Sequence, residues 1–162
     1  MVAQHEAPEE YGTIERSIQI DASPETVFEV VTRPEHLEQW WPDEARVEPA
    51  AGATGQLVFG DPSTGDATIP NITILSLEPP ARFTFRWTHP DDAEAGEDNS
   101  LLVVFELAPS GDGTQLRMTE TGFREQGWEV AVLEENLRLH EEGWDRHLAR
   151  LVHYAPTVRM PT

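Results

Sequence analysis

The feature that most constrains the fold is a helical pattern that follows a series of short strands and fills the last part of the chain. Between residues 126 and 153, apolar or semi-polar residues recur at intervals of four, three, four, four and three. They are Leu133, Leu137, His140, Trp144, Leu148 and Leu151. This spacing places them on one face of a long amphipathic helix, with acids and arginines on the remaining surface. Such a face needs an apolar partner, and we expect the preceding strands to supply it.

Alternating apolar and polar residues before this helix indicate short strands. The clearest run is 81–88, in which Phe83, Phe85 and Trp87 share one face. The other predicted strands are 13–20, 45–48, 55–60, 67–78, 100–108 and 114–121. Pro70 predicts an edge or a bulge within 67–78, because proline cannot donate a ladder hydrogen bond. The segment 109–113 predicts a hairpin turn, and 90–99 predicts a solvated loop.

Two short helices are expected after the first strand. The first begins at Ser23, a favoured N-cap that precedes a proline, and runs to about residue 31. The second opens at Pro34 and ends at Pro42, which cannot continue a helix. The fold class is therefore α+β: a curved antiparallel sheet of about six to seven strands wrapped around the C-terminal helix.

Length and composition predict one domain. The chain has 162 residues, which suits a single core over residues 12–155 between an acidic tail at 1–11 and a C-terminal tail at 156–162. No apolar run approaches the roughly 20 residues that cross a bilayer, so we expect no membrane insertion. The first ten residues lack the basic and apolar parts of a signal peptide, and cysteine is absent. These features favour a cytoplasmic location.

The charge excludes several classes of partner. Thirty acids face eleven arginines and no lysine, for a net charge of −19. A field of this sign repels phosphate backbones, so we expect no nucleic-acid partner. The charge is typical of a solubility or salt-adapted surface, and steering of cationic ligands is the alternative. The six histidines show no metal-ligand spacing, and phosphate-loop and dinucleotide motifs are absent, so we expect neither metal nor cofactor.

Candidate ligand-binding residues lie where the helical stripe would face the sheet. They are Trp40, Trp41, Phe59, Phe85, Trp87, Met118, Glu120, Leu137, His140 and Trp144. Aromatic side chains offer flat apolar surface to a ligand, and ordinary core packing is the alternative for each. Gly143 lies inside the helical pattern at a cost of about 1 kcal/mol against alanine. This glycine indicates a close backbone approach or a bend beside a ligand or the sheet, unless it is simply tolerated.

Glu120 is the most unusual of these candidates, because it shares an apolar strand face with Leu116 and Met118. A carboxylate there costs free energy unless it is paired or protonated. It is a candidate general acid or base, or a binder of a ligand hydroxyl or amine. The alternatives are a strand end that reaches solvent and a pair with an arginine. His140 could join it in an acid/base unit, or be a satisfied core histidine.

Five segments together resemble the START-like superfamily. Residues 18–28 (IQIDASPETVF) resemble its opening strand and helix. Residues 32–41 (TRPEHLEQWW) are similar to the branch named after the activator of a heat-shock chaperone's ATPase. Residues 77–87 (LEPPARFTFRW) match that branch closely, and 119–123 (TETGF) and 143–148 (GWDRHL) resemble its closing motifs. The resemblance covers about residues 13–153.

This resemblance implies a helix-grip fold with a deep cavity between sheet and helix. The superfamily includes lipid carriers, hormone receptors, polyketide cyclases and chaperone activators. Our first hypothesis is therefore a binding protein for a small hydrophobic molecule, apolar, aromatic or lipid-like, that works as a monomer or a homodimer. The alternatives are a cyclase- or hydrolase-type enzyme that uses Glu120 and His140, and an interaction protein akin to the chaperone activators.

Overall fold

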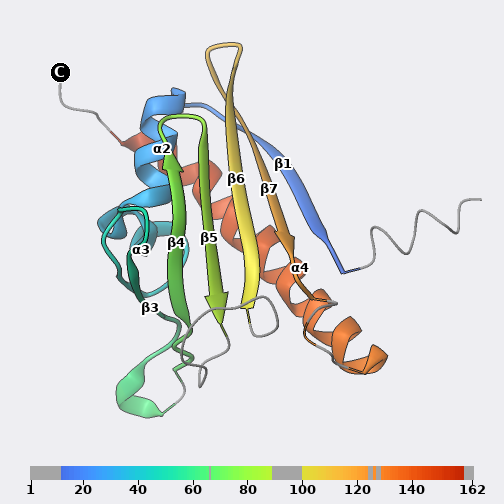
Figure 1. Cartoon of the computed structure of the whole chain (residues 1–162). Helices are drawn as coiled ribbons and strands as arrows, with labels where there is room; N and C mark the ends of the chain where they lie inside the picture. Colours follow the sequence, from blue (N-terminus) through green and yellow to red (C-terminus); the bar gives the residue numbers. More distant parts are fainter. Residues whose placement is uncertain (1–11, 66, 89–99, 124–125, 127–128, 159–162) are drawn as a thin grey trace, which may run out of the picture.

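The computed structural model describes residues 12–65, 67–88, 100–123, 126 and 129–158 (Figure 1). Within these residues a seven-stranded sheet combines with three α-helices in the predicted order. The strands are β1 (Ile14–Ile20), β2 (Glu44–Arg46), β3 (Thr54–Val58), β4 (Asn71–Glu78), β5 (Arg82–Thr88), β6 (Ser100–Ser110) and β7 (Gly113–Thr121). The helices are α2 (Pro24–Thr32), α3 (Pro34–Trp40) and α4 (Val130–Tyr154), with short 3-10 turns η2 (Pro62–Thr64) and η4 (Ala155–Thr157). The predicted α+β class is confirmed.

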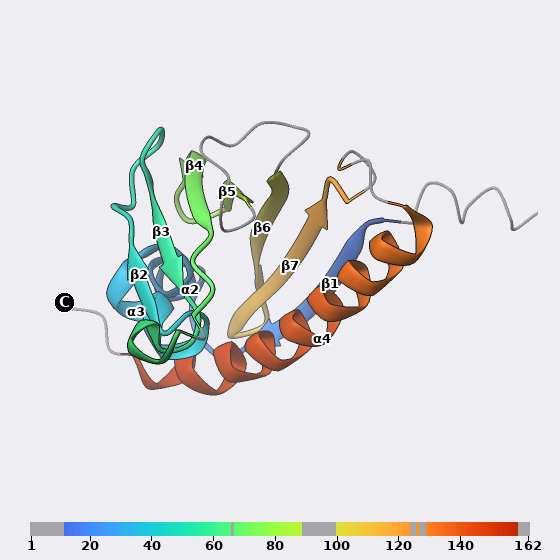
Figure 2. The ribbon, with the colours of Figure 1, turned by 90° about the horizontal axis from the view of Figure 1, so that it is seen from below.

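The sheet has the order β1-β7-β6-β5-β4-β3-β2, and every neighbouring pair is antiparallel. The first strand therefore pairs with the last, from Ile14 opposite Glu120 to Ile20 opposite Thr114. Figure 2 shows the strands arching over α4, which crosses the concave side of the sheet. This arrangement is the helix-grip fold that the strand-then-helix pattern predicts.

The short helices begin as the sequence predicts. Ser23 caps α2 by accepting a hydrogen bond of 3.2 Å from the backbone amide of Thr26. Pro34 opens α3, and the hydroxyl of Tyr154 near the end of α4 lies 2.7 Å from Nδ1 of His36 on α3. Since α2 also packs against β5, β6 and β7, these helices close one end of the sheet.

The core lies between the concave face of the sheet and the helices. Its largest fully buried side chains include Trp40, Phe83, Phe105 and Leu116. Each such side chain contributes about 1.5–3 kcal/mol relative to an exposed position. The α4 stripe is confirmed: Leu133, Trp144, Leu148 and Leu151 are buried, while Leu137 is partly buried and packs against the core.

Strand boundaries differ from the prediction around two turns. The strand predicted at 67–78 begins only at Asn71, because Pro70 has no amide to donate; Thr68 makes a single bridge with Phe59. The irregularity predicted at Pro70 lies instead between Ile74 and Ser76. The β6–β7 turn is also shorter than predicted, since Ser110 already pairs with Gly113.

Helix α4 begins at Val130, four residues after the predicted start, and Glu129 provides no side-chain cap. The loop predicted at 90–99 and the acidic tail predicted at 1–11 lie outside the described residues. At the other end, α4 runs into η4, and Val158 packs against the core. The segment 156–162, predicted to follow the domain, thus includes part of η4 and Val158.

Candidate functional site

A pocket of about 310 Å³ opens between α4 and the end of the sheet where β5 stops and β6 begins. Strand and loop residues form one wall, and one face of α4 forms the other. The lining residues are Trp41, Phe59, Thr68, Pro70, Trp87, Ser100, Leu101, Leu139, His140, Gly143, Trp144 and His147. Most of this surface is aromatic or aliphatic, so the pocket suits an apolar guest.

The wall formed by α4 follows from helical spacing. Leu139, Gly143 and His147 stand four residues apart, and His140 and Trp144 flank them. A Cβ atom added at Gly143 would meet only the side chain of His147, at 4.0 Å. The close backbone approach considered from the sequence is therefore absent at this glycine, which instead leaves open space in the middle of the helical wall.

An aromatic cluster around Trp41 forms the floor of the pocket. The ring of Trp41 lies 5.2 Å from Trp87 and 5.2 Å from Trp144, centroid to centroid. Phe85 at 5.6 Å and Phe59 at 6.1 Å complete its surroundings. Trp41 follows the last residue of α3, so the proline-terminated helix predicted from the sequence delivers this ring to the sheet. Tilted ring contacts at these separations add stability beyond the area they bury.

Glu120 lies behind this cluster with no exposed surface. Its Oε2 accepts a hydrogen bond of 2.7 Å from Nε1 of Trp87, and its Oε1 accepts one of 2.8 Å from Nε1 of Trp144. Nδ1 of His140 lies 3.0 Å from the same Oε1. Within the described part of the chain, two indoles and an imidazole compensate this carboxylate, which solvent does not reach.

His140 is partly exposed and forms part of the pocket wall. Burial lowers its pKa, but the charge of Glu120 and the hydrogen bond to it prevail and raise the pKa above its ordinary value. Trp87 and Phe123 hold the ring, with centroids at 5.6 Å and 5.2 Å and interplanar angles of 70° and 90°. The site therefore stabilises the protonated ring relative to a free histidine and holds it in a defined orientation.

His147 behaves in the opposite way. Burial, together with the charges of Arg146 and Arg150, lowers its pKa to about 4, against smaller opposing effects of the Trp40 backbone and Asp43. Its Nδ1 is buried and has no hydrogen-bond partner within the described part of the chain. The pocket therefore holds two histidines with opposite protonation preferences.

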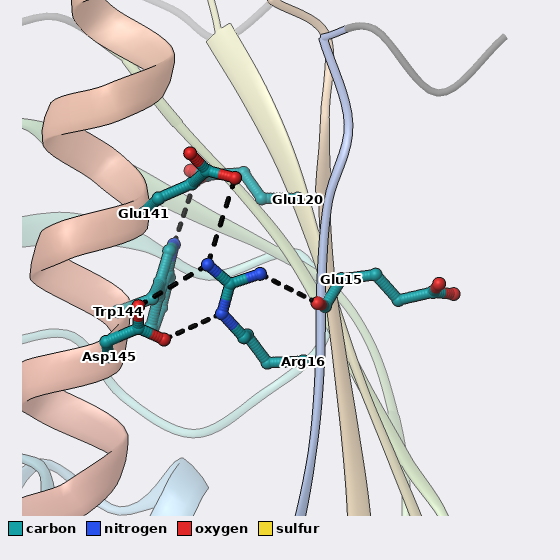
Figure 3. Close-up of polar contacts among 6 residues, drawn as sticks. All are labelled: Glu15, Arg16, Glu120, Glu141, Trp144 and Asp145. Atoms are coloured by element: carbon teal, nitrogen blue, oxygen red, sulfur yellow. Dashed lines mark hydrogen bonds and ion pairs between the residues drawn. The ribbon is translucent and has the colours of Figure 1, made fainter. Parts of the chain in front are cut away.

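A second polar contact joins α4 to the sheet beside Glu120. Arg16 on β1 donates from Nε to Oδ1 of Asp145 at 2.6 Å and lies 3.8 Å from Glu141. Figure 3 shows Arg16 reaching α4 on one side while Trp144 points toward Glu120. Two separate contacts, one buried and one exposed, thus fix the middle of α4 against β1 and β7.

The structure brings half of the candidate ligand-binding residues into the pocket wall: Trp41, Phe59, Trp87, His140 and Trp144. The others lie elsewhere. Trp40 is buried and donates to the backbone oxygen of Val30 at 3.1 Å. Phe85 and Met118 are fully buried, Leu137 packs against the core, and Glu120 stands behind His140. Strand alternation identifies a sheet face but cannot tell which part of that face is filled by core.

Sequence reasoning missed seven lining residues: Thr68, Pro70, Ser100, Leu101, Leu139, Gly143 and His147, although Gly143 drew attention as an unusual helical residue. The helical ones carried a usable signal, because Leu139, Gly143 and His147 repeat every fourth residue beside His140 and Trp144. The strand and loop residues carried none, since their proximity depends on long-range pairing.

A curved antiparallel sheet that grips a long C-terminal helix defines the helix-grip class of folds. The sequence profile of one family, described as "Activator of Hsp90 ATPase homolog 1-like protein", matches residues 21–155. The chain belongs to this family. The resemblance inferred from the five segments is thereby confirmed.

Solved structures with the same fold share little sequence with the chain. Protein CV1439 from Chromobacterium violaceum has 22% identity and a TM-score of 0.69, covering 91% of this chain and 99% of its own. The Aha1 dimer from Colwellia psychrerythraea has 20% identity and a TM-score of 0.69, covering 90% and 96%. CalU16 from Micromonospora echinospora has 23% identity and a TM-score of 0.63, covering 90% and 76%. No curated protein matches the chain. These similarities establish the fold.

Two further observations concern the described residues only. None of their helices is long and apolar enough to cross a membrane. No group of three or more histidine, aspartate or glutamate side chains among them is arranged to hold a metal ion.

Proposed function

We propose that this protein binds a small apolar or aromatic molecule in the pocket between α4 and the sheet. The observation that carries the proposal is the wall itself: Trp41, Phe59, Trp87 and Trp144 surround a space of about 310 Å³. Ligand sites are typically concave, mostly apolar and furnished with a few polar groups. His140 and His147 supply such groups here.

The size of the pocket narrows the ligand class. About 310 Å³ lies at the lower end of the range of roughly 300–1,000 Å³ that is usual for small-molecule sites. A compound of one or two fused rings fits this volume better than a long-chain lipid. The flat faces of Trp41 and Trp87 favour the same conclusion, since aromatic rings pack well against planar guests.

Titration with a fused-ring hydrocarbon, 2-isopropenylnaphthalene, tests the proposal. Native mass spectrometry of the purified protein first establishes whether a small molecule accompanies it. Calorimetry and tryptophan fluorescence then follow the titration, because three indoles line the pocket. We expect saturable binding of one molecule per chain and a change in tryptophan emission.

The Gly143→Leu variant is the matched test of location. The leucine side chain would enter the open space beside His147, so we expect binding to weaken at least tenfold. Ala149→Leu is the control, because it adds the same side chain at an exposed position of the same helix outside the pocket. Absence of binding to the wild-type protein, or equal binding by Gly143→Leu, would contradict the proposal.

Acid/base catalysis at the same site is the second candidate, favoured by the 3.0 Å contact between His140 and Glu120. A histidine oriented by a carboxylate is the usual form of a general base. A carboxylate that is saturated with donors would orient His140 and leave proton transfer to the histidine. Under this alternative, His140→Gln removes turnover of a bound substrate, whereas a pure binding protein turns over nothing.

The family's name refers to activation of a chaperone ATPase. This name corresponds to the third hypothesis from the sequence, a protein that acts by binding another protein. A surface interaction of that kind would be insensitive to Gly143→Leu, so the variant also separates this role from ligand binding. The relative from Colwellia psychrerythraea is a dimer, which supports including the homodimer beside the monomer. Sedimentation analysis of the purified protein distinguishes the two.

A further inference from the structure

Few groups in the described part of the pocket wall can recognise a polar atom of a ligand. Among these described lining residues, His140 and His147 alone are titratable, and Thr68 and Ser100 carry hydroxyls. The rest are aromatic, aliphatic, proline or glycine. Specificity for a polar substituent therefore depends on a small set of atoms.

The carboxylate oxygens of Glu120 are not among the atoms that would touch the ligand. It is fully buried, it is not a lining residue, and its two oxygens already accept from Trp87 and Trp144 and contact His140. What it does is orient His140. An ionised carboxylate only accepts hydrogen bonds, so Nδ1 of His140 is the donor toward Glu120. Nε2 is the nitrogen that remains for a ligand.

The orientation of His140 is further defined by its neighbours. Trp87 meets the ring at 70° and Phe123 at 90°, so the imidazole is held between two aromatic rings as well as by Glu120. The negative charge of Glu120 favours the imidazolium form, whose Nε2 carries a hydrogen. His147 does not provide an equivalent donor. Its pKa is lowered to about 4, so at neutral pH the ring carries a single N–H, and the backbone of Trp40 hydrogen-bonds to this ring.

We propose that Nε2 of His140 donates a hydrogen bond to a carbonyl oxygen of the ligand, with Glu120 as the positioning residue. The ligand class is then an uncharged aromatic carbonyl compound of one or two rings. Glu120 already balances the imidazolium charge, and a net charge of −19 disfavours an anionic ligand. This inference rests on the proposed function, because it requires that the pocket be occupied by a ligand.

A matched pair of compounds tests the inference. 2-Acetylnaphthalene carries a carbonyl oxygen where 2-isopropenylnaphthalene carries a methylene group of similar shape. We expect the wild-type protein to bind the ketone about tenfold or more tightly than the hydrocarbon, as one charge-assisted hydrogen bond predicts. Calorimetry at neutral pH measures both dissociation constants.

Two variants assign this preference to the dyad. In His140→Phe, which keeps a ring but has no donor, the ratio of the two dissociation constants should fall close to one. In Glu120→Gln the ratio should also fall, because the charge that favours the imidazolium is lost. If Glu120 had only a structural role, both compounds would weaken in parallel and the ratio would stay at its wild-type value. Ala149→Leu should leave the ratio unchanged.

A spectroscopic measurement on the wild-type protein avoids any dependence on variant folding. The infrared stretch of 2-acetylnaphthalene labelled with ¹³C at the carbonyl should shift to lower wavenumber on binding, relative to its position in cyclohexane. An unshifted stretch, or equal affinity for ketone and hydrocarbon, would overturn the inference while leaving the proposed function intact. Failure of both compounds to bind would instead overturn the proposed function, and the inference with it.

Discussion

At the scale of single residues, Glu120 shows how a buried charge can organise a site. An unpaired carboxylate in the interior would cost several kcal/mol, and removal of one partner from a buried pair typically costs about 3–5 kcal/mol. Glu120 avoids this cost through the two indole donors and His140. The donors come from β5 and α4, so one side chain of β7 joins three elements.

His147 illustrates the opposite case and leads to a prediction of pH dependence. Because burial and two arginines lower its folded-state pKa to about 4, below the ordinary value of about 6.5, the unfolded chain binds a proton more readily. Its contribution to stability is therefore present at neutral pH and is lost as pH falls from about 6.5 toward 4.

Chemical denaturation of the wild type and of His147→Gln at about pH 7 and about pH 4.5 tests this sign. We expect the stability of the wild type, relative to that of the variant, to be smaller at the lower pH. Carboxylates that titrate in the same range are common to both proteins and cancel in the difference. An equal difference at both pH values would show that His147 is not held in its neutral form.

At the scale of elements, α4 combines two demands, because its stripe packs against the sheet while part of it forms the pocket. Gly143 shows how the second demand limits the first. Its missing side chain leaves open space at the centre of the helical wall, although glycine is among the weakest helix formers. The helix thus gives up local stability at the position where a ligand would need room.

Gly143→Ala should raise the free energy of unfolding by about 1 kcal/mol, the difference in helix propensity between the two residues. Gly55→Ala is the contrasting control: there an added Cβ would overlap the backbone oxygen of Arg46 and lie 2.7 Å from Cβ of Val47, so that variant should be destabilised. Urea unfolding followed by circular dichroism measures both. A destabilised Gly143→Ala would mean that the helix needs glycine for its backbone.

At the scale of the whole molecule, the dominant property is the net charge of −19. Ion pairs such as Arg138 with Glu142 and Arg117 with Glu15 are exposed, and pairs of this kind contribute between zero and about 1 kcal/mol each. The excess of acids repels itself in the folded state. We therefore expect repulsion between the acids to outweigh the stabilisation from the exposed pairs.

We expect the thermal unfolding midpoint at neutral pH to rise between about 0.01 M and about 0.15 M NaCl, because the Debye length falls from about 30 Å to about 8 Å over this range. Scanning calorimetry measures the shift. The control is the same series near pH 4.5, the isoelectric point calculated from the sequence, where the rise should disappear. A midpoint that falls with salt at neutral pH would show that the exposed ion pairs dominate.

The sequence by itself determined the elements and their order. Period-two alternation identified the sheet face of Phe83, Phe85 and Trp87, and helical spacing identified the stripe of α4, because both patterns reflect local geometry repeated along the chain. Strand ends were less accurate, as at Pro70, since a strand extends only as far as its partner allows. The apolar surroundings of Glu120 also marked it from sequence as a residue that needed a partner.

Only the tertiary structure decided which candidates form the pocket and what compensates Glu120. Trp40 and Trp41 are adjacent in sequence, both are buried and their rings stack at 5.8 Å, yet of the two only Trp41 lines the pocket. The donors to Glu120 come from residues 20 to 33 positions away. Contacts of this kind depend on sheet register and on where α4 crosses the sheet, which local periodicity does not encode.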